Sequence, residues 1–318
     1  MTRKWLISCL CCLFATTFKS QTVVYTPSNN STEIAFASDT QAPLWVEKLF
    51  LKAHNNRTAT KLMFKDITER RPVSLFLLGD VVSLGSSNRS WKEMDKYLDK
   101  CRGECINVYG TMGNHEVMGT GKMGKKGQQK FQKYFPEHLP TGFAQIIDSV
   151  AVILLNSNFS SLSKAEDAQQ IKWYKELLTA LDTDPSIQYI ISGCHHSPYS
   201  NSKIVGSSKT VQQKFVPLFM RSKKSRLFLS GHSHNFEHFK KNGKDFLVIG
   251  GGGGLHQPLN SGGGDLSDLA PDYKPKFHYL TVRRLPDQLV VTSYKLKDDF
   301  TGFTQGLLMN INRPEIDL

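Results

Sequence analysis

Short apolar runs that each lead into a residue type able to bind a metal ion are the feature that most restricts the fold of this sequence. The runs cover residues 33–38, 73–79, 106–111, 189–193 and 226–230. The residues that follow them are Asp39, Asp80, Asn114, His195, and the pair His232 and His234. Such runs are typical of buried strands, and the carboxyl ends of strands line the ligand crevice of an open α/β sheet. The sequence therefore predicts that five strands deliver oxygen and nitrogen ligands to one edge of a sheet.

Helical periods alternate with these runs, which favours an α/β architecture. Residues 44–54 place Trp45, Val46, Leu49 and Phe50 on one stripe, so we expect a helix there with its apolar side packed inward. The other expected elements are helices at 91–101 and 165–181, two strands within 143–156, and strands at 246–249, 277–282 and 289–294. No repeat or composition break marks a second domain, and we expect one domain over residues 21–318.

The N-terminal residues 1–20 have the pattern of a signal peptide. Arg3 and Lys4 precede an apolar stretch over residues 5–15, which is too short for the roughly 20 apolar residues that span a bilayer. The alternative is a buried N-terminal strand or helix. The signal peptide predicts an exported protein, periplasmic or secreted, with no transmembrane segment.

Composition excludes several classes of protein. The chain has 318 residues, 39% of them hydrophobic, which is enough for a large core and excludes wholesale disorder. Three of its six cysteines lie within residues 1–20, so the rest of the chain is no disulfide scaffold. Cys101 and Cys105 either pair across a small loop or stay free. The formal net charge of +12 favours anionic partners, although scattered lysines more often form a solvated face than a specific nucleic-acid site.

The motifs around the strand ends resemble those of the calcineurin-like metallophosphoesterases. They read Asp39-Thr40-Gln41, Gly79-Asp80, Gly113-Asn114-His115-Glu116, His195-His196 and Gly231-His232-Ser233-His234. Their order fits the family from residue 33 to about residue 239. The resemblance implies a four-layer α/β/β/α sandwich of two mixed sheets flanked by helices, and it leans toward the purple-acid-phosphatase-like side of the family.

The resemblance also implies a site with two divalent or trivalent metal ions, drawn from Fe, Mn and Zn. Asp80 would bridge the ions and Asp39 and His234 would hold the first. The ligands of the second ion would be Asn114, His195 and His232. A hydroxide shared by the ions would attack phosphorus in line, and His115 would stabilise developing charge or protonate the leaving group.

Some positions depart from the family pattern or stay open. Gln41 stands where many members have a histidine, and Ser83 stands where purple acid phosphatases have a tyrosine, so no tyrosinate–iron chromophore is expected. Gln41 and Glu116 are each either a metal ligand or a residue that holds a ligand in place, with Glu116 expected to orient an imidazole. His195 is preferred over His196 as the ligand.

Substrate contacts are predicted for three residues near the motifs, namely His196, Tyr199 and His256. The glycine run over residues 250–254 is either a loop passing close beneath the substrate or a flexible connector.

The sequence favours an exported hydrolase of phosphate monoesters. A phosphodiesterase acting on cyclic nucleotides or lipid headgroups is the alternative within the family. A non-catalytic binding protein with a degenerate metal site and a basic protein that binds nucleic acid or surfaces are the alternatives outside it. The sequence gives no oligomeric state.

Overall fold

A computed structural model describes residues 23–26, 32–119, 121–139, 141–260 and 266–313. The expected signal peptide at residues 1–20 lies outside the described residues. In the part of the chain that is described, no helix combines the length and the apolar character that crossing a membrane requires.

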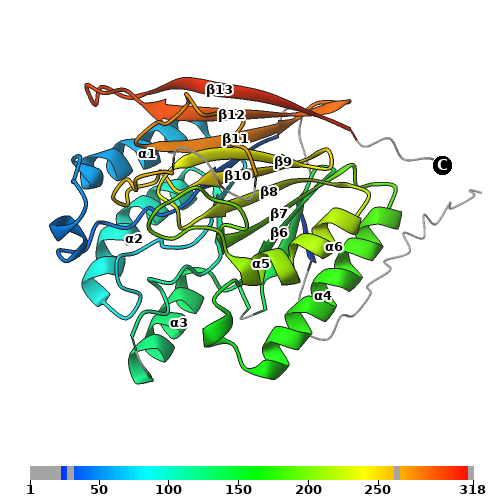
Figure 1. Ribbon diagram of the computed structural model, residues 1–318, viewed down its shortest axis with the longest axis horizontal. Coiled ribbons are helices and arrows are strands. Elements are labelled where there is room, and N and C mark those ends of the chain that lie inside the picture. Colours follow the sequence, from blue (N-terminus) through cyan, green and yellow to red (C-terminus); the bar gives the residue numbers. More distant parts are fainter. Residues whose placement is uncertain (1–22, 27–31, 120, 140, 261–265, 314–318) are drawn as a thin grey trace, which may run out of the picture.

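Two mixed sheets form the centre of the molecule (Figure 1). The seven-stranded sheet runs in the order β1 (Val23–Thr26), β5 (Phe143–Ile147), β6 (Val150–Leu155), β7 (Tyr189–His196), β8 (Ser225–Gly231), β10 (Lys244–Ile249) and β9 (Phe236–Lys241). The six-stranded sheet runs in the order β13 (Phe303–Asn312), β12 (Gln288–Leu296), β11 (His278–Arg284), β2 (Glu33–Ala37), β3 (Ser74–Leu77) and β4 (Asn107–Gly110). The strand-rich tail thus extends the second sheet, as the resemblance implied.

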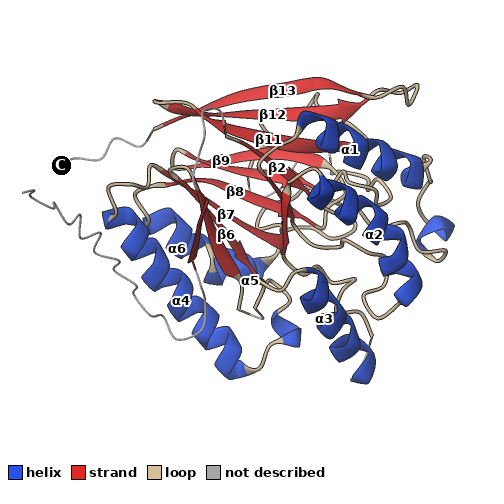
Figure 2. Ribbon diagram, turned by 180° about the vertical axis from the view of Figure 1, so that it is seen from behind, coloured by secondary structure: helices blue, strands red, loops and turns tan. Residues whose placement is uncertain are grey.

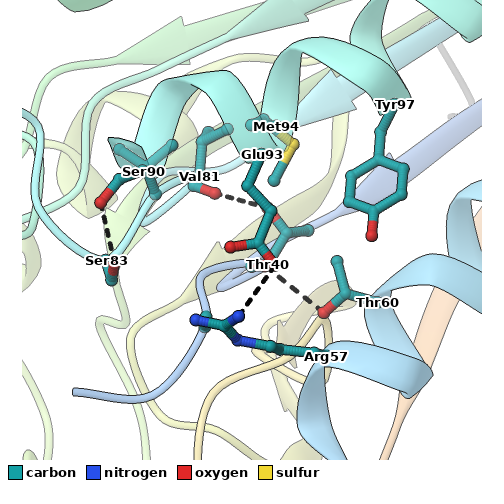
Figure 3. A pocket seen from close by; sticks show the side chains of 11 residues that line it. Thr40, Arg57, Thr60, Val81, Ser83, Ser90, Glu93, Met94 and Tyr97 are labelled. Atoms are coloured by element: carbon teal, nitrogen blue, oxygen red, sulfur yellow. Dashed lines mark hydrogen bonds and ion pairs between the residues drawn. The ribbon is translucent and has the colours of Figure 1, made fainter. Parts of the chain in front are cut away.

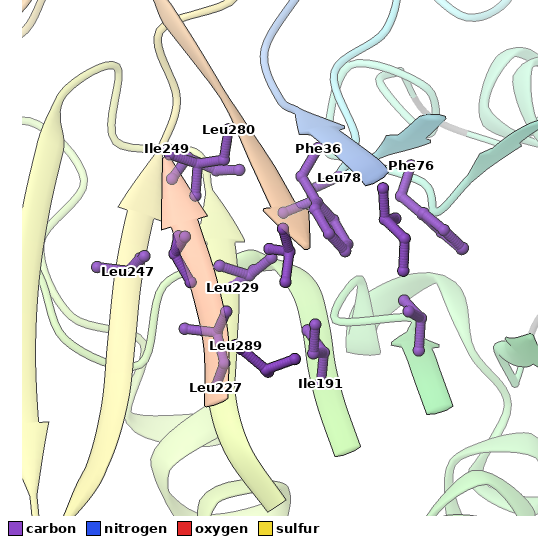
Figure 4. Packing of buried hydrophobic residues seen from close by; sticks show 14 of the residues in the cluster. Phe36, Phe76, Leu78, Ile191, Leu227, Leu229, Leu247, Ile249, Leu280 and Leu289 are labelled. Carbon is purple, nitrogen blue, oxygen red and sulfur yellow. The ribbon is translucent and has the colours of Figure 1, made fainter. Parts of the chain in front are cut away.

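Within each sheet, the strands that carry the site motifs run parallel to one another. β2, β3 and β4 pair in parallel within the six-stranded sheet, and β7 and β8 pair in parallel within the other. The inward faces of the two sheets meet in a continuous apolar core, of which Figure 4 shows Phe36, Phe76, Leu229 and Ile249 among others. Face-to-face packing of this kind brings the carboxyl ends of strands from both sheets near one another.

Helices cover both outer faces, which completes the four predicted layers. The six-stranded sheet is covered by α1 (Asn56–Arg70), α2 (Asn88–Gly103) and the end of α3 (Lys122–Tyr134). The seven-stranded sheet is covered by α4 (Lys164–Thr183), α5 (Lys209–Lys214) and α6 (Val216–Arg221). Figure 2 shows these two helical layers on opposite sides of the sheets. A four-layer sandwich is therefore confirmed.

The prediction of a helix at residues 44–54 is wrong. Only one short 3₁₀ turn, η1 (Glu47–Leu49), forms there, and its apolar stripe faces solvent: Trp45 is 76% exposed, Leu49 66% and Phe50 83%. The sheet face that this stripe would have covered is already occupied by α1, whose Ala59, Met63, Phe64 and Ile67 are buried. Periodicity identified an apolar stripe but carried no information on whether a partner surface was free.

The remaining cysteines are free. Cys101 is buried with its sulfur 3.7 Å from the Thr68 hydroxyl, Cys105 is exposed, and Cys194 is buried. The possible Cys101–Cys105 disulfide does not form, so the packed core stabilises this region without a covalent link.

Candidate metal centre

The predicted ligands gather where the ends of five strands from the two sheets meet. Asp39, Asp80 and Asn114 follow β2, β3 and β4 of the six-stranded sheet, whereas His195 lies in β7 and His232 follows β8 of the seven-stranded sheet. The prediction of a single sheet edge was therefore wrong, because the strands divide between two facing sheets. The same polar ends nevertheless converge.

Three of these residues adopt a left-handed backbone conformation that is uncommon outside glycine. The φ angles are 57° at Asp39, 50° at Asp80 and 66° at His232. Each such turn costs on the order of 1 kcal/mol or more and is kept where the surroundings fix it. Here the loops tie to one another: the Asp39 N–H donates to the Gly79 carbonyl at 3.1 Å, and the His232 N–H donates to an Asp39 carboxylate oxygen at 3.0 Å.

A second set of contacts fixes the residues just after Asp39 and Asp80. The Thr40 hydroxyl donates to the Val81 carbonyl at 3.1 Å, and the Thr60 hydroxyl on α1 lies within reach of the Thr40 carbonyl at 3.4 Å. Figure 3 shows these contacts in a small pocket between the two loops and helices α1 and α2. Helix α1 therefore supports the loop after Asp39 from outside.

Asp80 is the central group of the cluster. One carboxylate oxygen accepts the His115 backbone N–H at 2.8 Å, and the other lies 3.3 Å from His195 Nε2 and 3.8 Å from His115 Nε2. Burial by itself raises the pKa of Asp80, but the imidazoles of His195 and His115 outweigh it and hold that pKa well below its ordinary value. Asp80 is therefore a buried carboxylate anion, which can bind cations.

Backbone carbonyls orient two of the imidazoles. His195 Nδ1 donates to the Leu78 carbonyl at 3.0 Å, and His234 Nδ1 donates to the Leu255 carbonyl at 2.7 Å. Burial lowers the pKa of both rings, but the Asp80 carboxylate beside His195 and the Asp39 carboxylate beside His234 raise it by more, for His195 to about 9. Without cations Nε2 of each ring therefore carries a proton and faces acceptors: Asn114 Oδ1 at 3.0 Å from His195, and Asp39 Oδ1 at 3.3 Å from His234. Acceptors that converge in this way fit a cation between them, and this arrangement of the distal nitrogen is typical of metal-binding histidines.

Two overlapping groups of ligand atoms meet the spacing of a metal site. Asp39, Asp80 and His195 form one group, and His195, His196 and His232 form the other, with ligand atoms within 4.8 Å of one another in each. His195 belongs to both groups. The second ring of the pair, His196, has its Nδ1 2.8 Å from the Ser157 hydroxyl and its ring centroid 4.5 Å from that of His232.

The Gln41 side chain also turns toward the cluster. With its amide nitrogen donating to the carbonyls of Asp39 at 3.0 Å and Asp80 at 2.8 Å, the amide oxygen lies about 3.4 Å from His234 Nε2. An oxygen lone pair then points into the same space as His234 Nε2, which offers its own lone pair once a cation displaces the proton. A cation placed there would satisfy both, so the carboxamide fits the first metal position.

Glu116 holds the loops together through backbone amides. Its carboxylate accepts N–H groups of Asp80 at 2.9 Å, Val81 at 2.9 Å, Val82 at 3.1 Å and Gly113 at 2.7 Å. No imidazole is among these partners, so the expectation that Glu116 orients one was wrong. Every residue except proline has a backbone N–H group, so the sequence motif could not show that Glu116 binds these particular amides.

His115 stands beside Asp80 with its ring fixed from behind. Its Nδ1 donates to the Ser83 carbonyl at 2.8 Å, which leaves Nε2 facing Asp80. Burial lowers the pKa of His115, but the Asp80 carboxylate and the Ser83 carbonyl raise it by more, so the net shift is upward. A proton on Nε2 is therefore favoured in the absence of cations.

Two of the predicted substrate residues have other surroundings. Tyr199 is buried against Phe239 and Phe246, and its hydroxyl accepts from Lys241 at 3.2 Å, so it contributes packing. His256 is half-buried with no hydrogen-bond partner at Nε2. Burial lowers the pKa of His256 to about 4, so this ring is neutral at pH 7.

The glycine run is an anchored part of the site rather than a flexible connector. Gly252 donates to the Ser38 carbonyl at 2.9 Å and Gly254 to the Asp39 carbonyl at 3.0 Å. A Cβ at Gly250 would lie 2.0 Å from the Ser233 carbonyl oxygen, and one at Gly254 would lie 2.4 Å from the His234 ring. Only glycine permits this approach.

A sixth strand end was missed. Ser157 follows β6 and contacts His196, while the Asn158 amide donates to the Met112 carbonyl at 2.8 Å and so supports the loop that carries Asn114. The same rule would have found this segment, since residues 143–156 were expected to be strands.

Comparison with known proteins agrees with this fold and arrangement. The fold and the strand-end donors define a metal-dependent phosphoesterase, and the chain belongs to the calcineurin-like phosphoesterase family, whose model matches residues 32–236. No match was found among the curated proteins.

Solved structures resemble the chain in fold. Purple acid phosphatase PPD1 from yellow lupin (Lupinus luteus) seeds superposes with a TM-score of 0.68 at 13% identity, covering 91% of this chain and 55% of the lupin chain, so this chain spans about half of that length. GAP50, the anchor in the inner membrane complex of Plasmodium, gives 0.61 at 15% identity and 90% coverage of both chains. A dimetal phosphatase from Danio rerio gives 0.57 at 13% identity, covering 88% of this chain and 98% of that one.

Proposed function

We propose that this chain is an exported two-metal hydrolase of phosphate monoesters. The observation that carries the proposal is the convergence of Asp39, Asp80 and His195, with rings turned inward by backbone carbonyls. Carboxylate, amide and imidazole donors together suit Fe, Mn or Zn. Ions held there would polarise the phosphoryl group and supply an activated water. Export rests on the basic and apolar pattern of residues 1–20.

Each residue of the cluster has a task in this proposal. Asp39, His234 and Gln41 would hold the first ion, Asn114, His195 and His232 the second, and Asp80 would lie between them. His115 would bear a proton on Nε2, where Asp80 and the Ser83 carbonyl favour it, and would deliver that proton to the leaving oxygen. The backbone left-handed turns at Asp39, Asp80 and His232 aim these side chains into one space.

Turnover of nitrophenyl phosphate after loading with Mn, Zn or Fe tests the proposal. We expect Asp80→Asn to lower kcat at least about a hundredfold together with metal content, and His115→Ala to lower kcat about a hundredfold or more with metal content retained. His54→Ala and Glu69→Gln are the matched controls, because both residues lie outside the cluster. Most activity remaining in either site variant would refute the assignment. Faster cleavage of bis-nitrophenyl phosphate would instead identify a phosphodiesterase.

A further inference from the structure

Exposed apolar side chains are concentrated in one short segment beside the site. Of the large hydrophobic residues exposed in the described part of the chain, half lie within six positions: Trp45, Val46, Leu49 and Phe50. The others, Met123, Ile204, Leu269 and Leu308, occur singly. Single exposed apolar residues are ordinary, whereas a contiguous apolar patch marks an interaction surface. We call residues 42–53 the apolar loop.

The shape of the apolar loop argues against a small ligand. Small molecules bind in concave pockets. None of Trp45, Val46, Leu49 or Phe50 lines any of the three described cavities, although Ala42 and Ala53 at the ends of the loop each border one. The four side chains are exposed outside these cavities, which suits insertion into a deformable medium.

The charges on the loop favour an anionic surface. Lys48 and Lys52 are exposed among the apolar residues, while the carboxylate of Glu47 is engaged by the Leu44 N–H at 2.5 Å. Helix α3, whose Lys122, Lys125 and Lys126 are exposed, lies on the same side of the ribbon as the loop in Figure 1. Tryptophan, phenylalanine and leucine alternating with lysine is the composition of segments that lie in the headgroup region of a bilayer.

We propose that the apolar loop inserts into the surface of an anionic lipid bilayer. Trp45, Leu49 and Phe50 would enter the boundary between headgroups and acyl chains, and Lys48 and Lys52 would contact lipid phosphates. The loop begins directly after Gln41, so insertion would hold the candidate metal centre close to the lipid surface.

Tryptophan fluorescence gives a direct test, because the described tryptophans other than Trp45, which are Trp91 and Trp173, are buried. Vesicles of phosphatidylcholine with phosphatidylglycerol are titrated into the full-length protein carrying Trp5→Phe, which removes the fourth tryptophan of the sequence. Vesicles of phosphatidylcholine alone serve as the comparison. We expect a shift of emission to shorter wavelength with the anionic vesicles, little shift with the neutral ones, and a decrease of binding with salt. Trp45→Phe should retain binding in a sedimentation assay and lose the spectral shift.

Paired variants separate the loop from the rest of the surface. Trp45→Ser with Phe50→Ser should weaken sedimentation with anionic vesicles about tenfold or more, whereas Ile204→Ser with Leu308→Ser should leave it unchanged. Residues 1–22 are common to all these chains, so their contribution cancels. Equal sedimentation of both double variants would overturn the proposal. So would a spectral shift that follows protein concentration without vesicles, since a second copy of the chain would then cover the loop.

This proposal does not depend on catalysis. Asp80→Asn is expected to bind anionic vesicles as the unaltered chain does, because Asp80 is buried and far from lipid contact in the proposed orientation. A chain that binds vesicles but hydrolyses no phosphate ester would leave the lipid proposal intact and refute the proposed function alone.

Discussion

The carboxylate of Glu116 accepts the backbone N–H of Asp80 at 2.9 Å, together with three further amides from the same two loops. Asp80 in turn accepts the backbone N–H of His115 from the loop that carries Glu116. The two carboxylates thus bind each other's loops in a reciprocal arrangement. The position of the central candidate ligand is therefore set by a residue that need not touch a metal ion.

Glu116→Gln tests this arrangement. An amide nitrogen cannot accept a hydrogen bond, so two buried N–H groups would lose their partner, each at a cost of about 1–3 kcal/mol. We expect the free energy of unfolding to fall by about 2–6 kcal/mol and the affinity for metal to fall with it. Urea denaturation and metal titration measure the two effects, with the exposed Glu69→Gln as control. Unchanged metal affinity would show that the loops hold Asp80 without Glu116.

Gln41 is expected to help retain the first ion. Gln41→Leu keeps the side-chain size and removes both the oxygen that faces His234 and the N–H donors to the carbonyls of Asp39 and Asp80. We expect metal analysis after gel filtration to find fewer ions per chain in this variant. Gln41→His, which supplies an imidazole, should retain at least as many ions as the unaltered protein. Equal metal content in all three chains would remove Gln41 from the ligand set.

Close packing makes Gly127 of α3 irreplaceable. A Cβ there would lie 2.0 Å from the Glu116 carbonyl oxygen, so Gly127→Ala should destabilise the fold by about 1–3 kcal/mol, although alanine is the better helix former. Gly103 at the end of α2 is the matched control, because nothing lies within 4 Å of its added Cβ. Gly103→Ala should be neutral or stabilise by up to about 1 kcal/mol. Chemical denaturation compares the two, and equal effects would contradict the packing argument.

His138 gives the fold a defined sensitivity to acid. It is buried against Phe131 and Phe143 with no partner for either ring nitrogen, and burial lowers its pKa to about 3. Between that pKa and the ordinary value of about 6.5 the unfolded chain binds the proton and the folded chain does not. Stability contributed by the neutral ring is therefore present above about pH 6.5 and is lost as the pH falls, by at most about 1.4 kcal/mol per unit.

His138→Leu should remove this part of the pH dependence. The difference in unfolding free energy between the variant and the unaltered chain should grow in the variant's favour as the pH is lowered from 7 toward 4. Urea denaturation at several pH values measures it. Two profiles that stay parallel over that interval would show that His138 is already protonated in the folded state or finds a partner.

The sequence predicted which strand ends carry the candidate ligands, because buried strands are apolar and the residues that follow them are polar. Asp39, Asp80 and His232 were found by this contrast alone, and the family motifs added His115 and the two-sheet fold. The contrast could not assign strands to sheets, so the ligands were expected at one edge. It also failed at Trp45 and Phe50, where an apolar stripe lacks a partner surface in the folded chain.

Other features depend on groups that a side-chain pattern does not contain. The four amides bound by Glu116 and the carbonyls that orient His195 and His234 belong to the backbone. The glycine run over residues 250–254 was left undecided because its function is the space it leaves for the His234 ring and the Ser233 carbonyl. Such roles become visible only when distant segments are brought together.

The left-handed turns at Asp39, Asp80 and His232 have a consequence for how this protein can change over generations. Glycine at any of the three would relieve the backbone strain and remove a buried polar side chain. In a relative that no longer binds metal ions, replacing these residues would therefore increase the stability of the fold. Keeping Asp39, Asp80 and His232 makes the fold less stable than it would be with glycine at these positions. Selection keeps this loss of stability only while metal binding is useful. These three positions are therefore the first to examine in a relative that has lost catalytic activity.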